Sequence, residues 1–331
     1  MAAPFSLKFP IVVRSPNWLG DAIMALPAVR NLKTLADTHS ITVAAPAKLA
    51  ALWEACPFVD RVLPFNQPRN LRATASALRA GGFSSALLLP NSFRSAAEAV
   101  CAGIPEVIGY PGHFRRWILT KMIEPADFSP ARQHQQFYYL DLITALGGPE
   151  QADFPALRPH GVRPPLLPDQ PPICLCPGAE YGPAKRWPID RYAETARLLA
   201  EKTGAPLLIL GAKNDELAAA LLAASLPGSL NLCGKTSLQE LIHLLAAARL
   251  VLSNDSGAMH LASALGVPTV ALFGSTEPRR TGPLGVRTRV LRHHVPCSPC
   301  FLRDCPLDFA CMMQINPAEV AANALELLEA K

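Results

Sequence analysis

The chain has 331 residues, enough for two hydrophobic cores, and half of its residues are hydrophobic. No apolar stretch reaches the roughly 18 residues of a membrane-spanning helix, and residues 1–8 lack the pattern of a signal peptide, so we expect a cytosolic protein. The net charge of +5 is concentrated in residues 1–165, but no basic motif interleaved with aromatic residues indicates nucleic acid.

Strands and helices are predicted to alternate through the first half of the chain. Short apolar runs indicate buried strands, and apolar residues at helical spacing indicate helices between them. The expected strands are 11–14, 41–45, 61–64 and 85–89, and the expected helices are 22–35, 48–55, 71–80, 95–102 and 136–146. Residues 110–135 lack a clear pattern. Residues 147–172 hold eight prolines, which is typical of a connection between domains.

A second alternating series begins at residue 173. Its expected strands are 173–176, 206–210, 230–233, 250–252 and 267–273, and its expected helices are 189–202, one from about 216, 237–247, 258–265 and 317–330. The alternation predicts an α/β protein with two doubly wound domains, 1–160 and 173–331, joined by a Pro-rich linker at 161–172. In such sheets, ligands bind beyond the carboxyl ends of the strands.

The stretch 249–278 reads as strand, polar turn, helix and strand. Asp255, Ser256 and Gly257 stand where the first strand passes into the helix, whose free N–H groups favour an anion. The corner can therefore hold a phosphate and, through the carboxylate, sugar hydroxyls. Simple capping of the helix by Asp255 or Ser256 is the alternative. His260 lies one turn further on, where a core or surface histidine is the ordinary interpretation.

Three more charged residues follow predicted strands. Asp21 starts a helix and is either a general base or a partner of the helix dipole. Lys185 lies in a loop rich in Gly and Pro, where it can meet a diphosphate or be an ordinary surface lysine. Asp215 follows a strand that ends near Gly211, a position where carboxylates bind ribose or simply start a helix.

Four cysteines near the C-terminus invite comparison with a zinc site. Cys297 and Cys300 have the spacing of zinc ligands, but five residues separate Cys305 from Cys311. We expect reduced packing cysteines and no metal in the reaction, with metal binding at these four residues left open.

Three motifs together resemble the heptosyltransferases of lipopolysaccharide core synthesis. They are NWLGDAIMALP at 17–27, PGAEYGPAKRWP at 177–188 and SNDSGAMH at 253–260. The resemblance covers nearly the whole chain. It implies a GT-B-type glycosyltransferase with two Rossmann-like domains facing a cleft, in which the N-terminal domain takes the acceptor and the C-terminal domain takes ADP-L-glycero-D-manno-heptose. The last helix would pack back on the N-terminal domain.

The resemblance also implies roles for the site residues. Asp21 would be the base of an inverting, metal-independent transfer that needs no cofactor. Lys185 and the helix N-terminus at Ser256–Gly257 would stabilise the departing ADP. The other residues expected to bind the donor are Asp215 at the ribose, Thr236 near the adenine, Asp255 at heptose hydroxyls, Ser256, Gly257 and His260.

The acceptor implied by the resemblance is heptosyl-Kdo2-lipid A, whose first heptose would receive the sugar. Its carboxylates and phosphates would attract the basic first domain to the cytoplasmic face of the inner membrane, without an anchor. The residues expected to meet the acceptor are Asn17, Arg94, Arg115, Arg116 and Lys121. Alternatives are heptosyltransferases I and III of the same family, a nucleotide-sugar epimerase, or a binding protein without catalysis.

Overall fold

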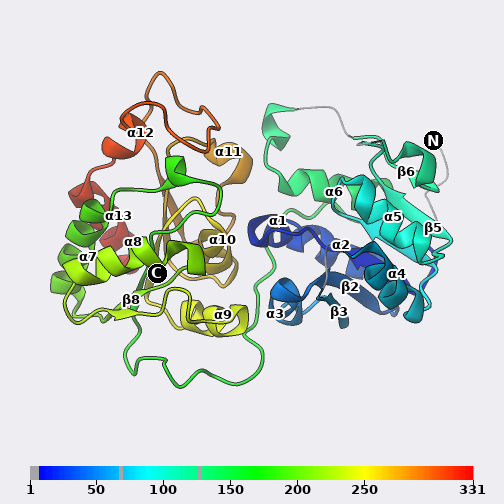
Figure 1. The fold of residues 1–331 in the computed structure, drawn as a ribbon, viewed down its shortest axis with the longest axis horizontal. Coiled ribbons are helices and arrows are strands. Elements are labelled where there is room, and N and C mark those ends of the chain that lie inside the picture. Colours follow the sequence, from blue (N-terminus) through cyan, green and yellow to red (C-terminus); the bar gives the residue numbers. More distant parts are fainter. Residues whose placement is uncertain (1–6, 67–69, 113, 126–128, 331) are drawn as a thin grey trace. The chain divides into compact units, whose positions relative to one another are not determined.

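The structure is a computed structural model that describes residues 7–66, 70–112, 114–125 and 129–330 (Figure 1). The chain divides into two compact units, Met1–His160 and Gly161–Lys331. Each unit contains a parallel sheet of six strands with its own helices, which confirms the predicted α/β class. Among the described residues, no helix combines the length and apolar character needed to cross a bilayer.

The first sheet has the strand order β3-β2-β1-β4-β5-β6. Its strands are β1 (Ile11–Arg14), β2 (Ile41–Pro46), β3 (Arg61–Phe65), β4 (Ser85–Leu88), β5 (Glu106–Gly109) and β6 (Lys121–Met122). β1 lies at the centre, where Val12 pairs in register with Thr42 on one side and Ala86 on the other. All four residues of this strand are buried. Three of them are apolar and the fourth, Arg14, pairs with Glu98, so the strand can be covered on both faces.

Helices of the first unit pack in pairs around this sheet. They are α1 (Leu19–Met24), α2 (Leu26–Ala36), α3 (Ala50–Glu54), α4 (Leu71–Ala80), α5 (Phe93–Cys101) and α6 (Gln136–Ala145). α4 packs against α5, and α2 against α6. Ala75 and Leu78 of α4 share one apolar cluster with Val12 and Leu88 of the sheet, so this cluster joins the helices to the central strands.

The second sheet repeats the same arrangement, with the order β12-β11-β10-β7-β8-β9. Its strands are β7 (Ile173–Cys176), β8 (Leu207–Ile209), β9 (Leu230–Asn231), β10 (Leu250–Asn254), β11 (Thr269–Leu272) and β12 (Thr288–Leu291). Counted within each unit, both sheets have the strand order 3-2-1-4-5-6 of the Rossmann fold. The order reverses between β1 and β4 in the first unit and between β7 and β10 in the second. Ligand sites are therefore expected beyond the carboxyl ends of these four strands.

The helices of the second unit are α7 (Ile189–Thr203), α8 (Glu216–Ser225), α9 (Leu238–Ala246), α10 (Gly257–Ala264), α11 (Pro278–Thr281), α12 (Ala310–Met313) and α13 (Pro317–Glu329). Figure 1 shows α7, α8 and α13 gathered on one side of the second unit. α13 packs closely on α7, and its buried Val320, Ala321 and Ala324 belong to the core of this unit. The apolar face of the last helix is therefore buried within its own unit, and our expectation that this helix packs back on the N-terminal domain stays a prediction.

Most predicted elements are present, with bounds that differ by a few residues. The single helix expected at 22–35 is instead α1 and α2, because Pro27 occupies the first turn of a new helix that begins at Leu26. We did not predict β5, β6 or β12, which are short and contain charged residues. The Pro-rich residues 161–172 form no helix or strand.

Candidate active site

Lys185 and Asp255 meet where the strand order of the second unit reverses. Lys185 ends the short 3-10 turn η4 (Pro183–Lys185) in the loop after β7, and Asp255 directly follows β10. Nζ of Lys185 lies 2.5 Å from Oδ2 of Asp255, and the ring of Tyr181 lies 4.8 Å from the same ammonium group. β7 and β10 are neighbours in the sheet, so their two loops necessarily meet at its carboxyl edge.

Asp255 is held by two donors and does not cap the helix that follows. Its Oδ2 accepts a second hydrogen bond from Oγ1 of Thr276, at 2.6 Å, and the residue is only 5% exposed. Ser256 occupies the N-cap position of α10, yet its side chain makes no capping bond and lies 3.0 Å from Oγ of Ser253. The alternative of simple capping is thus wrong. The first turn of α10, which begins at Gly257, keeps the dipole that favours an anion.

A second ion pair lies beside the first. Arg186 donates from Nη2 to Oδ1 of Asp215 at 3.2 Å, and Oδ2 of Asp215 accepts from the N–H of Ala212. Asp215 ends the turn η5 (Lys213–Asp215) after β8. A Cβ at Gly178 would lie 2.2 Å from the Asp215 carboxyl carbon, so only glycine permits this approach. Lys185 and Arg186, consecutive residues of the loop after β7, thus pair with carboxylates in the segments that follow the two neighbouring strands, β10 and β8.

Asn254 fixes the shape of that loop, a role that we did not predict. Its Oδ1 accepts from the backbone N–H of Trp187 and from the hydroxyl of Tyr192, both at 3.1 Å. Its Nδ2 donates to the carbonyl of Pro177 at 2.7 Å. Asn254 is completely buried, so these bonds are shielded from water and hold both ends of the loop that carries Lys185.

The other predicted donor residues lie around the same edge of the sheet. Thr236 is half-buried between β9 and α9, and the next residue, Ser237, caps α9. Gly257 is the first residue of α10, and His260 is buried one turn further on, at 6% exposure. The structure therefore gathers the predicted donor residues at the carboxyl edge of one sheet, with Lys185 and Asp255 in direct contact.

In the first unit, Asp21 lies in the first turn of α1, close to the end of β1. Its Oδ1 accepts a hydrogen bond from Nε2 of Gln135 at 3.1 Å, and the same amide nitrogen lies 3.3 Å from the hydroxyl of Tyr139. Burial raises the pKa of Tyr139 well above its usual value, and the Asp21 carboxylate adds to the rise. Tyr139 therefore stays a neutral phenol beside Asp21.

Two predicted acceptor residues also follow the central strands of the first unit. Asn17 is exposed after β1, and its Oδ1 accepts from Nη2 of Arg14 at 3.2 Å. Arg94, on α5 after β4, pairs through Nε with Glu98 at 3.2 Å. Glu98 is fully buried and also accepts from Nε of Arg14 at 2.9 Å, so one carboxylate joins two guanidinium groups beside the end of β1.

The position of Arg115 contradicts our prediction that this residue meets the acceptor. It is completely buried, and its side chain donates to the carbonyl oxygens of Tyr110 at 2.6 Å and Pro90 at 2.5 Å. Tyr110 directly follows β5, and Pro90 is the second residue after β4, so Arg115 connects the ends of neighbouring strands. A guanidinium inside the unit cannot meet a lipid anion. Arg116 is exposed and pairs with Glu124, while Lys121 pairs with Glu106 at 3.0 Å.

Replacing Arg115 by Ala should therefore destabilise the protein without a specific effect on acceptor affinity. The change leaves the Pro90 and Tyr110 carbonyls without their charged donor, and such a bond contributes about 1.5–3 kcal/mol. Chemical denaturation should show the free energy of unfolding falling by about that amount. Arg116→Ala, on the neighbouring exposed residue, should change it by about 0.5 kcal/mol or less. Equal stability of the two variants would contradict the structural role of Arg115.

Comparisons with known proteins point to one family. The family model described as glycosyltransferase family 9 (heptosyltransferase) matches residues 71–310. Lipopolysaccharide heptosyltransferase 2 of Escherichia coli K12 is 33% identical over 305 residues, which is 85% of this chain and 87% of that protein. Lipopolysaccharide heptosyltransferase 1 of Pseudomonas aeruginosa is 36% identical, but over 121 residues, 37% of this chain and 34% of that protein.

The solved structure of E. coli ADP-heptose LPS heptosyltransferase II is similar to this chain in fold. It superposes with a TM-score of 0.82 and 30% sequence identity, and the match covers 96% of this chain and 98% of that one.

Proposed function

Because the chain belongs to glycosyltransferase family 9, the heptosyltransferases, and is therefore a glycosyltransferase, we propose that it acts as a heptosyltransferase II. In this reaction, L-glycero-D-manno-heptose passes from ADP-heptose to the first heptose of the lipid A–Kdo inner core. The relative that is named heptosyltransferase 2 spans 85% of the chain, whereas the relative named heptosyltransferase 1 spans 37%. This difference in coverage favours member II over member I.

The contact between Lys185 and Asp255 carries the proposal for the donor. It puts a cation, a buried carboxylate and the start of α10 at one point, beyond the carboxyl ends of β7 and β10. A nucleoside diphosphate sugar needs those three features, because its diphosphate is anionic and its sugar presents hydroxyls. Asp255 would accept bonds from heptose hydroxyls, and Lys185 would turn towards the diphosphate.

Stabilisation of the leaving group follows from the same residues. When the bond to the anomeric carbon breaks, negative charge grows on the departing ADP. Lys185 and the N–H groups at the start of α10 would stabilise that charge without a catalytic metal. Asp215 would hold the ribose and Thr236 would lie near the adenine. Thr276 would keep the Asp255 carboxylate in place through its 2.6 Å hydrogen bond.

Asp21 would be the base that takes the proton from the acceptor hydroxyl, giving inversion at the anomeric carbon. Its carboxylate is only partly buried and is oriented by Gln135, as a base accessible to substrate requires. Asn17 and Arg94 would contact the acceptor nearby. Mass spectrometry of core oligosaccharide after deletion of the gene would test the assignment. A core that stops after one heptose supports it, and a core without heptose supports member I.

We also propose that the first unit contacts the cytoplasmic face of the inner membrane. Phe114 and Trp117 are 92% and 89% exposed, and Arg116 lies between them in the turn η2 (Arg116–Ile118). Aromatic rings enter the interface between lipid headgroups and acyl chains, and a basic residue adds attraction to anionic lipid. Because Arg115 is buried, we expect these two aromatic rings to make the main contact with the membrane that holds the acceptor.

The double variant Phe114→Ser/Trp117→Ser should bind vesicles containing anionic phosphatidylglycerol at least about tenfold more weakly. Burial of one such ring contributes about 1.5–3 kcal/mol, and about 1.4 kcal/mol corresponds to tenfold in affinity. Co-sedimentation at increasing salt measures both the binding and its electrostatic part. Val286→Ser, at a valine that is 98% exposed in the second unit, is the matched control and should bind like the wild type. Wild-type binding by the double variant would refute the contact.

A further inference from the structure

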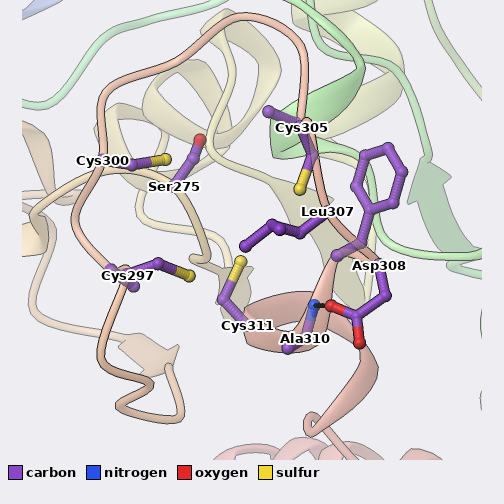
Figure 2. A pocket seen from close by; sticks show the side chains of 11 residues that line it. Ser275, Cys297, Cys300, Cys305, Leu307, Asp308, Ala310 and Cys311 are labelled. Atoms are coloured by element: carbon purple, nitrogen blue, oxygen red, sulfur yellow. Dashed lines mark hydrogen bonds between the residues drawn. The ribbon is translucent and has the colours of Figure 1, made fainter.

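Four cysteines of the segment 297–311 line one pocket in the second unit. Cys297, Cys300, Cys305 and Cys311 share it with Ser275 and Leu307. Figure 2 shows the four sulfur atoms pointing into the space that the segment encloses. All four thiols are free.

We infer that this pocket is a structural zinc site with four cysteine ligands. Cys297 and Cys300 have the two-residue gap of closed zinc sites, and the fold brings Cys305 and Cys311, which follow after gaps of four and five residues, to the same pocket. Thiolate sulfur is a ligand set that selects zinc over magnesium or calcium. Binding would release one proton from each thiol to solvent as four Zn–S bonds form. The site is separate from the Lys185–Asp255 contact.

The thiols must turn further inwards to bind an ion. Within the described part of the chain, no three ligand side chains are yet close enough together to hold a metal. In Figure 2 the side chain of Leu307 reaches between Cys305 and Cys311. Leu307 is 64% exposed, so it can leave this space at little cost. Residues 292–309 form no helix or strand, so no ladder of backbone hydrogen bonds prevents the thiols from converging.

Positively charged side chains lie near the proposed zinc site. Four thiolates and one Zn²⁺ carry a net charge of −2. Arg292 donates to Oγ of Ser298 at 3.4 Å, the guanidinium of Arg280 lies 5.4 Å from the ring of Phe301, and Arg303 stands inside the segment. Arg280 and Arg303 would offset part of the negative charge of the metal centre, whereas Arg292 already pairs with Glu277 at 2.9 Å.

A metal at this place would stiffen the support of the donor loop. The segment between Cys300 and Cys305 accepts two hydrogen bonds from that loop. Tyr181 donates to the carbonyl of Phe301 at 2.7 Å, and the N–H of Ala184 donates to the carbonyl of Arg303 at 3.0 Å. The N–H of Phe301 in turn donates to the carbonyl of Ser275, next to Thr276, at 2.8 Å. Zinc would therefore hold both the loop of Lys185 and the partner of Asp255.

The test uses the full-length protein without a polyhistidine tag, stripped with a chelator under reducing conditions and titrated with Zn²⁺ alone. One zinc per chain should bind, and X-ray absorption should show four sulfur ligands at about 2.3 Å. Co²⁺ in its place should give the strong visible bands of a tetrahedral thiolate site. Four of the nine thiols should become protected from a thiol reagent on binding.

Variants separate this site from nonspecific thiol binding. Cys300→Ser and Cys305→Ser, at partly exposed positions, should each bind zinc at least about 100-fold more weakly. Cys101→Ser, at an exposed cysteine of the first unit, should bind it like the wild type. Failure to take up zinc, a shell of nitrogen and oxygen ligands, or wild-type affinity in the two pocket variants would overturn the site. Metal removal should also weaken ADP binding reversibly; unchanged ADP affinity would overturn the supporting role.

Discussion

Asp21→Asn is expected to reduce turnover by about 10²–10⁴-fold while leaving the affinity for ADP-heptose nearly unchanged, since removal of a general base has that typical cost. Asparagine keeps an oxygen that can still accept the bond from Gln135, so the shape of the site is preserved while the base is lost. Asp21 belongs to the first unit, whereas the predicted donor residues belong to the second. Steady-state kinetics and calorimetric titration with ADP would separate the two effects.

Asp153→Asn is a suitable control, because it removes an exposed carboxylate from the same unit. It should retain wild-type turnover. Near wild-type turnover in Asp21→Asn would show that Asp21 is not the base. A loss of donor affinity in that variant would instead make Asp21 a ligand contact.

Lys185→Met should weaken ADP binding by about tenfold or more and lower turnover by about 10²–10³-fold. Methionine keeps the apolar stem but removes the charge that meets the diphosphate. Removing one preorganised donor that stabilises the charge developing in the transition state typically lowers turnover by this factor. The change also removes the ion pair of the buried Asp255 and leaves it the hydrogen bond from Thr276, so unfolding should be measured alongside activity. Calorimetric titration with ADP reports the binding effect directly.

Lys202→Met provides the matched control, because Lys202 is exposed near the end of α7 in the same unit. It should bind ADP like the wild type. Unchanged ADP affinity in Lys185→Met would remove this lysine from the phosphate site. Lys185→Arg should recover part of the binding, since its guanidinium keeps the charge but not the shape of an ammonium group.

The fold and the turn between β10 and α10, which holds Asp255, could be predicted from the sequence because the patterns that indicate them are local. The run 250–252 and the helical spacing from Ala258 identify β10 and α10 without knowledge of the rest of the chain. β5 escaped notice because four residues beginning with Glu106 do not resemble a buried strand. Its glutamate is accommodated by pairing with Lys121, a contact between residues that are far apart in the sequence.

Contacts across long sequence separations explain what the sequence could not reveal at the site. Asn254 lies within the motif at 253–260, but neither its role nor that of Thr276 follows from the sequence, because only the folded sheet brings them to the donor loop and to Asp255. The burial of Arg115 was equally hidden. An arginine in an irregular segment normally predicts a solvated surface, and only the carbonyls at the ends of β4 and β5 give it an interior role.

The central claim is tested most directly by mass spectrometry of purified acceptors incubated with the protein and ADP-L-glycero-D-manno-heptose. The two acceptors are Kdo2-lipid A that carries one heptose and Kdo2-lipid A that carries none. We predict that the first acceptor gains a single heptose and the second gains nothing. Transfer to the acceptor without heptose, or no transfer to either acceptor, would contradict the assignment.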